Sequence, residues 1–160
     1  MQVGVIGCGT AGPAAAIMLA RRGHRVQLFD QAAELKPLGA GILLQPTGMA
    51  VLEQLGLLGG LLRLGSRVER LLGTDTRGRG VLDVRYADLR LDLFGLGVHR
   101  GALFAALHAE ADRMGVEVRS GVAAASYEER ADCVSFRDRN GREHGPFDLL
   151  VVADGARSSL

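Results

Sequence analysis

A glycine-spaced turn close to the N-terminus constrains the fold of this chain more than any other feature. Residues 7–12 read Gly-Cys-Gly-Thr-Ala-Gly, a GxGxxG pattern. The turn follows a short apolar run that contains Val3, Val5 and Ile6, and it opens a segment with helical apolar spacing, Thr10 to Arg22. A strand, a tight turn and a helix in this order predict the first part of a βαβ unit in a parallel sheet.

Each glycine of the turn has its own physical task. Gly7 permits the sharp change of direction, Gly9 lets the backbone approach a ligand without a Cβ in the way, and Gly12 lets the helix pack closely on the strand. The unpaired amides and the partial positive charge of a helix N-terminus stabilise an anion. The turn, with Thr10 and Ala11 at its centre, is therefore predicted to hold a pyrophosphate.

The second strand is predicted from Arg25 to Asp30 and ends in a carboxylate. An acidic residue about 20 positions after the glycine turn accepts hydrogen bonds from ribose hydroxyls and repels a 2'-phosphate. Asp30 therefore favours a dinucleotide with an unphosphorylated adenosine ribose and disfavours NADP at this site. The complete strand, helix, strand and acid favour a dinucleotide site over an ordinary glycine turn, but they leave FAD and NAD undistinguished.

Composition narrows the class of protein. The chain has 160 residues, of which 48% are hydrophobic and 23% are charged, as in one ordinary globular domain. A net charge of +1 gives no basic surface for nucleic acid, and no apolar run is long enough for a membrane span. The basic residues Arg21 and Arg22 follow the N-terminal apolar stretch, whereas an export signal carries them in front, so we expect this stretch to be mature structure. The two distant cysteines in turn predict a reduced, cytoplasmic protein.

Cysteine and histidine positions argue against a disulfide framework and against a metal centre. Cys8 and Cys133 are far apart and form no CxxC pair, which is typical of a reduced protein. Cys8 is expected to fill space in the tight turn rather than to react. The four histidines are scattered without ligand spacing, so no metal site is predicted.

The regular alternation of strands and helices is interrupted after Asp30 and returns at Arg100. We expect a helix from Pro46 to a stop at Gly56, a leucine-rich turn to Gly65, and an inserted β-hairpin, with residues 57–98 as part of a substrate-side segment. From Arg100 a helix runs to Gly115, before a third sheet strand, a β-meander and a buried strand. The predicted strands beyond residue 56 are Arg67 to Leu72, Val81 to Tyr86, Val116 to Val118, Val122 to Glu128, Cys133 to Arg137 and Phe147 to Val152.

Four segments together resemble the FAD-dependent aromatic hydroxylases, the flavoprotein monooxygenase family that includes para-hydroxybenzoate hydroxylase. They are the turn Gly7 to Gly12 with Asp30, the segment Gly39-Ala-Gly-Ile42 before a helix that ends in Leu55-Gly56, Arg100-Gly-Ala-Leu103, and Asp148 to Ser158 with Asp154-Gly155 at its centre. The last segment is the most specific. The resemblance implies a Rossmann-like α/β FAD-binding fold, FAD as the cofactor, NADH or NADPH as the reductant and a small aromatic substrate.

The resemblance also assigns residues beyond the glycine turn. Asp154 and Gly155 are implied near the cofactor pyrophosphate, Arg100 is implied to contact FAD, and the backbone near Val122 is implied to border the adenine. One position departs from the family, in which an arginine commonly follows the acid of the second strand. Here Asp30 is followed by Gln31, so the adenosine contacts are expected to differ.

Family members continue well beyond the Asp-Gly segment, whereas this chain ends at Leu160. Residues 1–160 are therefore expected to be the N-terminal portion of an FAD-binding domain, truncated and inactive as given, with no catalytic residue to name. Self-association is expected through apolar surface on the helix from Arg100 and on the strand to Val152. The alternatives are an NAD-dependent Rossmann dehydrogenase and a non-catalytic dinucleotide-binding module.

Overall fold

The computed structural model describes residues 1–36, 39–158 and 160, and the chain forms two compact units. The first unit comprises residues 1–37 and 104–160, and the second comprises residues 38–103. The second unit includes the predicted segment 57–98 but begins well before it. The assignment of that segment to a substrate side stays a prediction. Among the described residues, no helix combines the length and the apolar character that crossing a bilayer requires.

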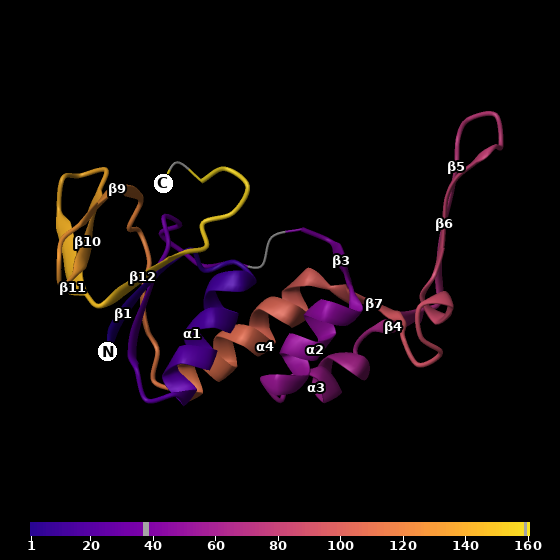
Figure 1. Ribbon diagram of the computed structural model, residues 1–160, viewed down its shortest axis with the longest axis horizontal. Coiled ribbons are helices and arrows are strands. Elements are labelled where there is room, and N and C mark those ends of the chain that lie inside the picture. Colours follow the sequence, from indigo (N-terminus) through magenta and orange to yellow (C-terminus); the bar gives the residue numbers. More distant parts are fainter. Residues whose placement is uncertain (37–38, 159) are drawn as a thin grey trace. The chain divides into compact units, whose positions relative to one another are not determined.

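A parallel sheet of four strands forms the centre of the first unit (Figure 1). Its order is β12-β1-β2-β8, so that the last strand of the chain lies beside the first. Neighbouring strands are parallel throughout, with Val5 opposite Val151 on one side and Leu28 on the other. The parallel sheet and its third strand are confirmed. The bounds are β1 Gln2–Ile6, β2 Arg25–Phe29, β8 Glu117–Arg119 and β12 Leu149–Val152.

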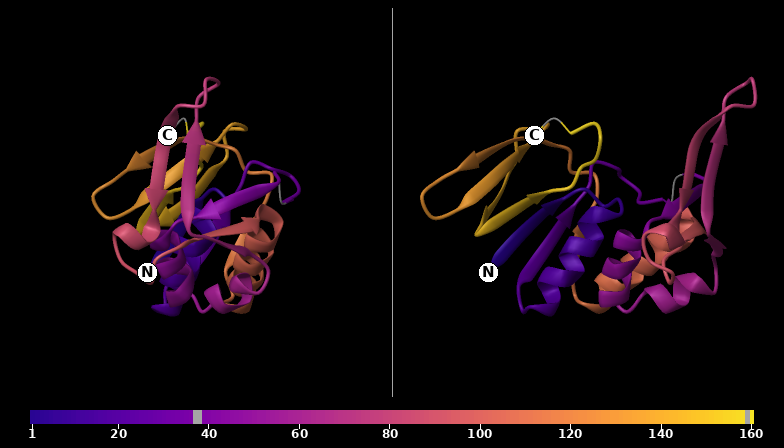
Figure 2. Two further views of the ribbon diagram at one scale, coloured as in Figure 1. Left: turned by 90° about the vertical axis from the view of Figure 1, so that its right-hand side faces the viewer. Right: turned by 45° about the vertical axis from the view of Figure 1, so that its right-hand side comes forward.

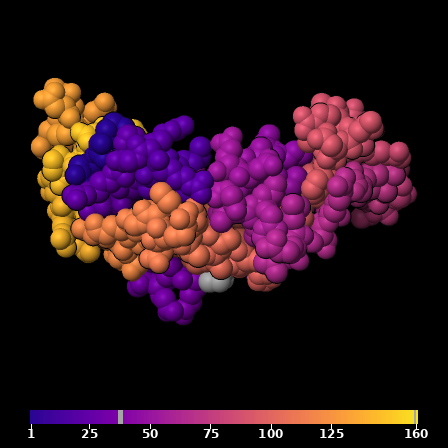
Figure 3. All heavy atoms as spheres, turned by 90° about the horizontal axis from the view of Figure 1, so that it is seen from below, coloured from indigo at the N-terminus to yellow at the C-terminus, as the bar shows by residue number. Residues whose placement is uncertain are grey.

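Helices α1 (Ala11–Arg21) and α4 (Arg100–Arg113) confirm the helices predicted after the glycine turn and from Arg100. The α1 residues Ala16 and Ile17 are fully buried. The part of α4 that belongs to the first unit lies beside α1, as the space-filling view shows in orange and indigo (Figure 3). An ion pair joins the two helices, with 2.6 Å between Arg21 Nη2 and Glu110 Oε1.

The predicted β-meander is present and covers the face of the sheet opposite α1 (Figure 2). It consists of β9 (Ala124–Glu129), β10 (Val134–Asp138) and β11 (Glu143–Phe147). Aromatic rings join the two layers, because the buried ring of Phe29 has its centroid 4.9 Å from that of Phe136 and 5.9 Å from that of Phe147. Gly4 leaves room for this contact, since a Cβ there would come within 3.0 Å of the Phe147 ring.

The prediction of one buried strand from Phe147 to Val152 is wrong. Phe147 ends β11 of the meander, and β12 begins only at Leu149. Between them Asp148 accepts a hydrogen bond of 2.6 Å from the Gln2 N–H, which turns the chain from one sheet into the other. β12 is an edge strand of its sheet, so Leu149 and Val152 are 38% and 42% exposed instead of buried.

The apolar surface expected on the strand to Val152 is therefore present. On the helix from Arg100 the larger apolar side chains are buried or half-buried, and the exposed apolar residues are the small Ala105 and Ala109. Leu107 and Ala111 of α4 are completely buried where this helix lies beside α1. Self-association stays a prediction.

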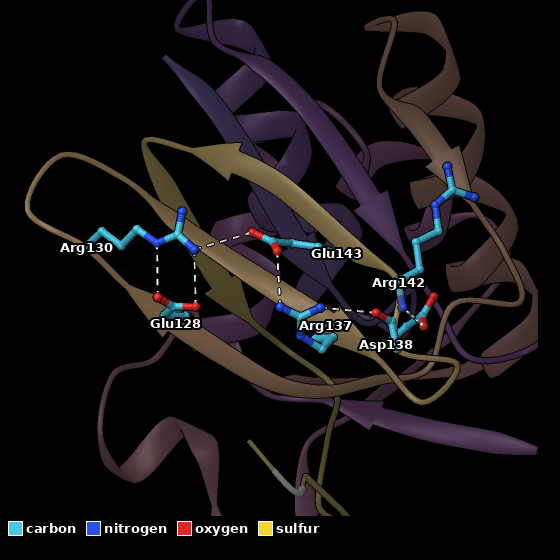
Figure 4. A network of polar contacts seen from close by, with 7 residues as sticks. Glu128, Arg130, Arg137, Asp138, Arg142 and Glu143 are labelled. Carbon is cyan, nitrogen blue, oxygen red and sulfur yellow. Dashed lines mark hydrogen bonds and ion pairs between the residues drawn. The ribbon is translucent and has the colours of Figure 1, made fainter.

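Charged side chains line the outer face of the meander (Figure 4). Arg130 bonds Glu128 through Nε at 3.0 Å, and Arg137 bonds Glu143 through Nη2 at 3.2 Å. All four side chains are largely exposed, so solvent screens these pairs and each contributes little to stability. Their consequence is a charged outer face on strands whose other face carries the buried ring of Phe136.

The second unit holds a small antiparallel sheet that the sequence did not predict. Its order is β3-β7-β4, and the hairpin β5-β6 forms a separate two-stranded sheet. Arg67 belongs to β4 rather than to the hairpin, and Tyr86 begins a 3₁₀ turn rather than ending a strand. The hairpin is present, but the predicted bounds of its two strands were wrong by one to three residues. The bounds are β3 Gly41–Leu44, α2 Pro46–Gln54, α3 Leu58–Leu62, β4 Ser66–Val68, β5 Arg70–Thr74, β6 Gly80–Arg85, η1 Tyr86–Asp88 and β7 Gly95–His99.

The aromatic contact between sheet and meander predicts unequal effects of two substitutions on neighbouring strands. Phe136→Ala removes a ring that is 1% exposed, and it should lower the free energy of unfolding by about 3–5 kcal/mol. Tyr127 lies opposite Phe136 in β9 but is 55% exposed, so Tyr127→Ala should cost less than about 1 kcal/mol. Urea denaturation followed by circular dichroism measures both values. Equal losses would contradict the packing described here.

The ion pair between α1 and α4 predicts a pH-dependent part of stability. Hydrogen bonds from Arg113 and then Arg21 lower the pKa of Glu110 to about 2. A carboxyl group with a lowered folded-state pKa stabilises the fold above its unfolded pKa of about 4.3, and this contribution is lost as the pH falls towards 2.

At pH 7, Glu110→Gln should therefore lower the free energy of unfolding by about 1–2 kcal/mol, after allowance for the exposed Arg113. The difference between the two proteins should shrink below about pH 4.5 and vanish near pH 2. Denaturation curves at several pH values test this. A difference that stays constant down to pH 2.5 would show that Glu110 does not titrate as described.

Candidate functional site

The glycine turn links the end of β1 to the start of α1 and lies against the segment after β12. Gly7 has a positive φ of 105° and donates its N–H to Phe29 O at 2.7 Å. A Cβ on Gly7 would come well inside 3.0 Å of the Ala153 carbonyl oxygen, and one on Gly12 would overlap the carbonyl oxygen of Gly7. Backbone packing therefore requires both glycines, and the positive φ of Gly7 agrees with the predicted tight turn.

Gly9 differs from the other two glycines because its surroundings are open. A Cβ on Gly9 would meet no atom of the described chain within 4 Å. At the next position Thr10 is the N-cap of α1, and its side chain makes no capping hydrogen bond within the described part of the chain. The first amides of a helix have no partner inside the helix, so this open stretch presents donors and a partial positive charge to an anion.

Asp30 follows β2, and the structure gives its carboxylate a role that the sequence did not predict. Oδ2 accepts a hydrogen bond of 2.7 Å from the Cys8 N–H, and Oδ1 accepts one of 2.8 Å from the Ala32 N–H. Asp30 thus fixes the glycine turn and the loop after β2 at the same time. An ionised carboxylate has about four acceptor sites, so both oxygens retain capacity for a ribose hydroxyl.

A small pocket brings together five of the predicted site residues. Its walls include Gly7, Asp30, Gln31, Val122 and Asp154. Gly155, which follows Asp154, has a positive φ of 88°. Backbone hydrogen bonds fix one wall, because the Val122 N–H donates to Asp30 O at 2.8 Å.

Two arginines on the same pocket were missed by the sequence reasoning. Arg139 and Arg157 both line it. The Arg139 N–H donates to Ala123 O at 2.9 Å, which holds the meander turn against this wall. The sequence marks that turn by Asn140-Gly141, but nothing in it shows that the turn reaches Asp30. Arg157 lies within the family-like Asp-Gly segment, and that position was its only signal.

Cys8 is enclosed within the turn. It is 2% exposed, and burial together with the nearby Asp30 charge raises the pKa of its thiol to about 12. A thiol in this state does not form the thiolate that reacts, which agrees with a space-filling role. Its carbonyl oxygen lies 3.1 Å from Nε2 of His108 on α4.

Arg100 belongs to the second unit. It begins α4 and donates its N–H to Ala40 O at 3.1 Å. A Cβ on Gly39 would lie 2.9 Å from Arg100 Nη1, so the glycine at position 39 leaves room for the guanidinium group. A contact between Arg100 and a cofactor stays a prediction.

A larger cavity of about 500 Å³ lies between the meander and β12, but its chemistry does not suit a diphosphate. Three of its lining residues are acidic, namely Glu129, Asp132 and Asp148, and only Arg130 is basic. Carboxylates at this density repel an anion. No described residue lines both this cavity and the pocket beside the glycine turn.

The remaining polar clusters are structural in character. His144 and Asp138 form a buried pair, with 3.0 Å between Nε2 and Oδ2, and this hydrogen bond holds the pKa of Asp138 below its usual range. No group of three potential metal ligands occurs among residues 1–36, 39–158 and 160.

Comparison with known proteins identifies what this arrangement resembles. The family model described as "FAD binding domain" matches residues 1–160. The chain is 33% identical over 165 residues to 3-amino-4-hydroxybenzoate 2-monooxygenase of Streptomyces cremeus, which covers 99% of this chain and 40% of that protein. The chain therefore spans about 40% of the length of this curated relative.

Solved structures agree with the sequence comparison. 2-Methyl-3-hydroxypyridine-5-carboxylic acid oxygenase is similar with a TM-score of 0.81 and 29% identity, over 99% of this chain and 40% of that one. HpxO of Klebsiella pneumoniae, solved in complex with FAD, is similar with a TM-score of 0.76 and 27% identity, over 97% of this chain and 40% of that one. The matched family decides between FAD and NAD in favour of FAD.

The packing of the glycine turn predicts unequal losses of stability for two alanine substitutions three residues apart. In Gly12→Ala the new methyl group meets the Gly7 backbone, which cannot move freely, so the free energy of unfolding should fall by at least about 2–3 kcal/mol. In Gly9→Ala the methyl group enters open space, so stability should change by less than about 1 kcal/mol. Thermal denaturation of both variants tests this difference, and a Gly12→Ala variant as stable as Gly9→Ala would refute it.

Proposed function

This chain belongs to the FAD-binding domain family, and on that premise we propose that it forms the N-terminal, FAD-binding portion of an NAD(P)H-dependent monooxygenase that hydroxylates a small aromatic compound. The name of the relative from Streptomyces cremeus, a hydroxybenzoate monooxygenase, supports the reaction and the substrate class. No catalytic residue is proposed within residues 1–160, because the candidate site residues are proposed to contact only the nucleotide end of the cofactor.

The observation that carries the proposal is the open glycine turn beside Asp30. Donors from Gly9, Thr10, Ala11 and Gly12 fit a diphosphate, because they combine unpaired amides with the positive end of α1. Asp30 fits the hydroxyls of an adenosine ribose, which FAD carries without a 2'-phosphate.

The other residues that line the pocket are proposed to contact the adenosine and the pyrophosphate. Gln31 and the backbone of Val122 would border the adenosine, while Asp154 and Gly155 would lie at the pyrophosphate. Arg139 and Arg157 add positive charge beside the carboxylates of Asp30 and Asp154, which lowers the cost of bringing an anionic ligand to this wall. Arg100 is proposed to contact the same cofactor.

FAD, when bound, supplies the hydride acceptance and the oxygen activation that aromatic hydroxylation requires. The residues of this chain bind the nucleotide end and orient it. The turn holds its backbone amides fixed before the ligand arrives, since Asp30 and the neighbouring strands already fix their positions. Such preorganisation reduces the entropic cost of binding.

Flavin binding tests the proposal directly. The chain should bind FAD and should bind FMN at least about tenfold more weakly, because FMN lacks the adenosine monophosphate half that these residues are proposed to contact. Asp30→Asn should weaken FAD binding by about tenfold through loss of charge-assisted hydrogen bonds to the ribose and to Cys8. Isothermal titration calorimetry and quenching of flavin fluorescence give the dissociation constants.

A matched control is Asp132→Asn, which removes an exposed carboxylate from the other cavity and should leave FAD affinity unchanged. Equal affinity for FAD and FMN would contradict the proposed site. Oxidation of NADH or NADPH by the FAD-loaded protein tests the reductant separately.

A further inference from the structure

We propose that His108 is a positioning residue for the cofactor: it holds the carbonyl of Cys8 and thereby turns the amide of Gly9 towards the bound diphosphate. The inference rests on the proposed function and adds His108 of α4 to the residues that support the glycine turn. Neither the glycine pattern nor the spacing of the acid points to this histidine.

The peptide groups on both sides of Cys8 are held by partners from different elements. Its N–H donates to Asp30 Oδ2 at 2.7 Å, and its carbonyl oxygen lies 3.1 Å from His108 Nε2. Because a carbonyl oxygen only accepts, Nε2 must carry the proton in this hydrogen bond. Cys8 is 2% exposed, so without His108 its carbonyl would lack a hydrogen-bond partner among the described residues in a nearly dry environment.

Peptide geometry converts this hydrogen bond into an orientation of Gly9. The Cys8–Gly9 peptide is not among the cis bonds of the chain. In a planar trans peptide the C=O and the following N–H point in opposite directions. A carbonyl directed at α4 therefore directs the Gly9 N–H away from α4. Gly9 is also the glycine of the turn with open surroundings, where a ligand can approach the backbone.

The imidazole ring is itself held in place. It stacks on the ring of Phe104, one helical turn earlier, with centroids 4.0 Å apart and planes 28° apart. Two residues further along α4, Glu110 ties this helix to α1 through its ion pair with Arg21. Since α1 begins at the glycine turn, the helix that carries the donor and the helix that follows the turn are linked to one another.

The test replaces His108 with residues that either lack or retain a side-chain N–H. His108→Phe and His108→Met remove the donor while filling the space, whereas His108→Gln retains an N–H at similar reach. The probe is ADP, which carries the diphosphate without the flavin. Isothermal titration calorimetry should show affinity for ADP about five- to tenfold weaker in His108→Phe and His108→Met, and within about twofold of wild type in His108→Gln.

A second readout separates orientation of the turn from general stability. In ¹H–¹⁵N spectra, ADP should shift the Gly9 amide proton downfield in the wild-type chain and in His108→Gln, and the shift should be much smaller in the variants without a donor. Arg113→Gln is the matched control, because it removes a partner of Glu110 at the end of the same helix and leaves Arg21, His108 and the turn unchanged. It should leave both ADP affinity and the Gly9 shift unchanged.

The outcomes distinguish the two levels of the proposal. If the wild-type chain binds ADP and His108→Phe or His108→Met gives the same affinity and the same Gly9 shift, the role of His108 is overturned and the proposed function stands. If the wild-type chain shows neither ADP binding nor a Gly9 shift, the proposed function fails and this inference fails with it. If one donor-free variant does not fold, the other provides the comparison with His108→Gln.

Discussion

The close approach of two backbone segments, at Gly7 and at Ala153, is the constraint on which the rest of the structure depends. β1 lies between β2 and β12, so both of its edges are paired and its side chains are buried from Val3 to Ile6. The segments after these three strands then meet at one end of the sheet. Parallel strands place their carboxyl ends at the same edge of the sheet. The glycine turn, Asp30 and Asp154 therefore meet there, although they lie far apart in the sequence.

The sequence predicted the elements of this arrangement better than their connections. The turn, α1 and β2 have strong local signals, namely glycine spacing, apolar periodicity and a terminal acid, and all three are present. The strands β3 and β7 were missed because they are short and contain glycines, so they show neither strict alternation nor a long apolar run. The split of the last predicted strand at Asp148 depends on a hydrogen bond to Gln2, which periodicity cannot reveal.

The same division applies to the candidate site. Glycine spacing indicated which backbone positions must lack a side chain, and the contacts of Gly7 and Gly12 agree with it. The second role of Asp30, the approach of Arg139 and the contact of His108 with Cys8 all join residues that lie far apart in the chain. A single sequence carries no local signal for such contacts. They follow only from the way in which the meander and α4 cover the two faces of the sheet.

The discontinuous make-up of the first unit has a consequence for the order of folding. The second unit is inserted between β2 and most of α4, so the central sheet joins segments from both ends of the chain. During synthesis β1, α1 and β2 emerge first, but β1 gains its second neighbour only when residues 149–152 have been made. Contacts of such long sequence separation form slowly because loop closure must precede them. The glycine turn between β1 and α1 is thus synthesised well before the strand that completes its surroundings.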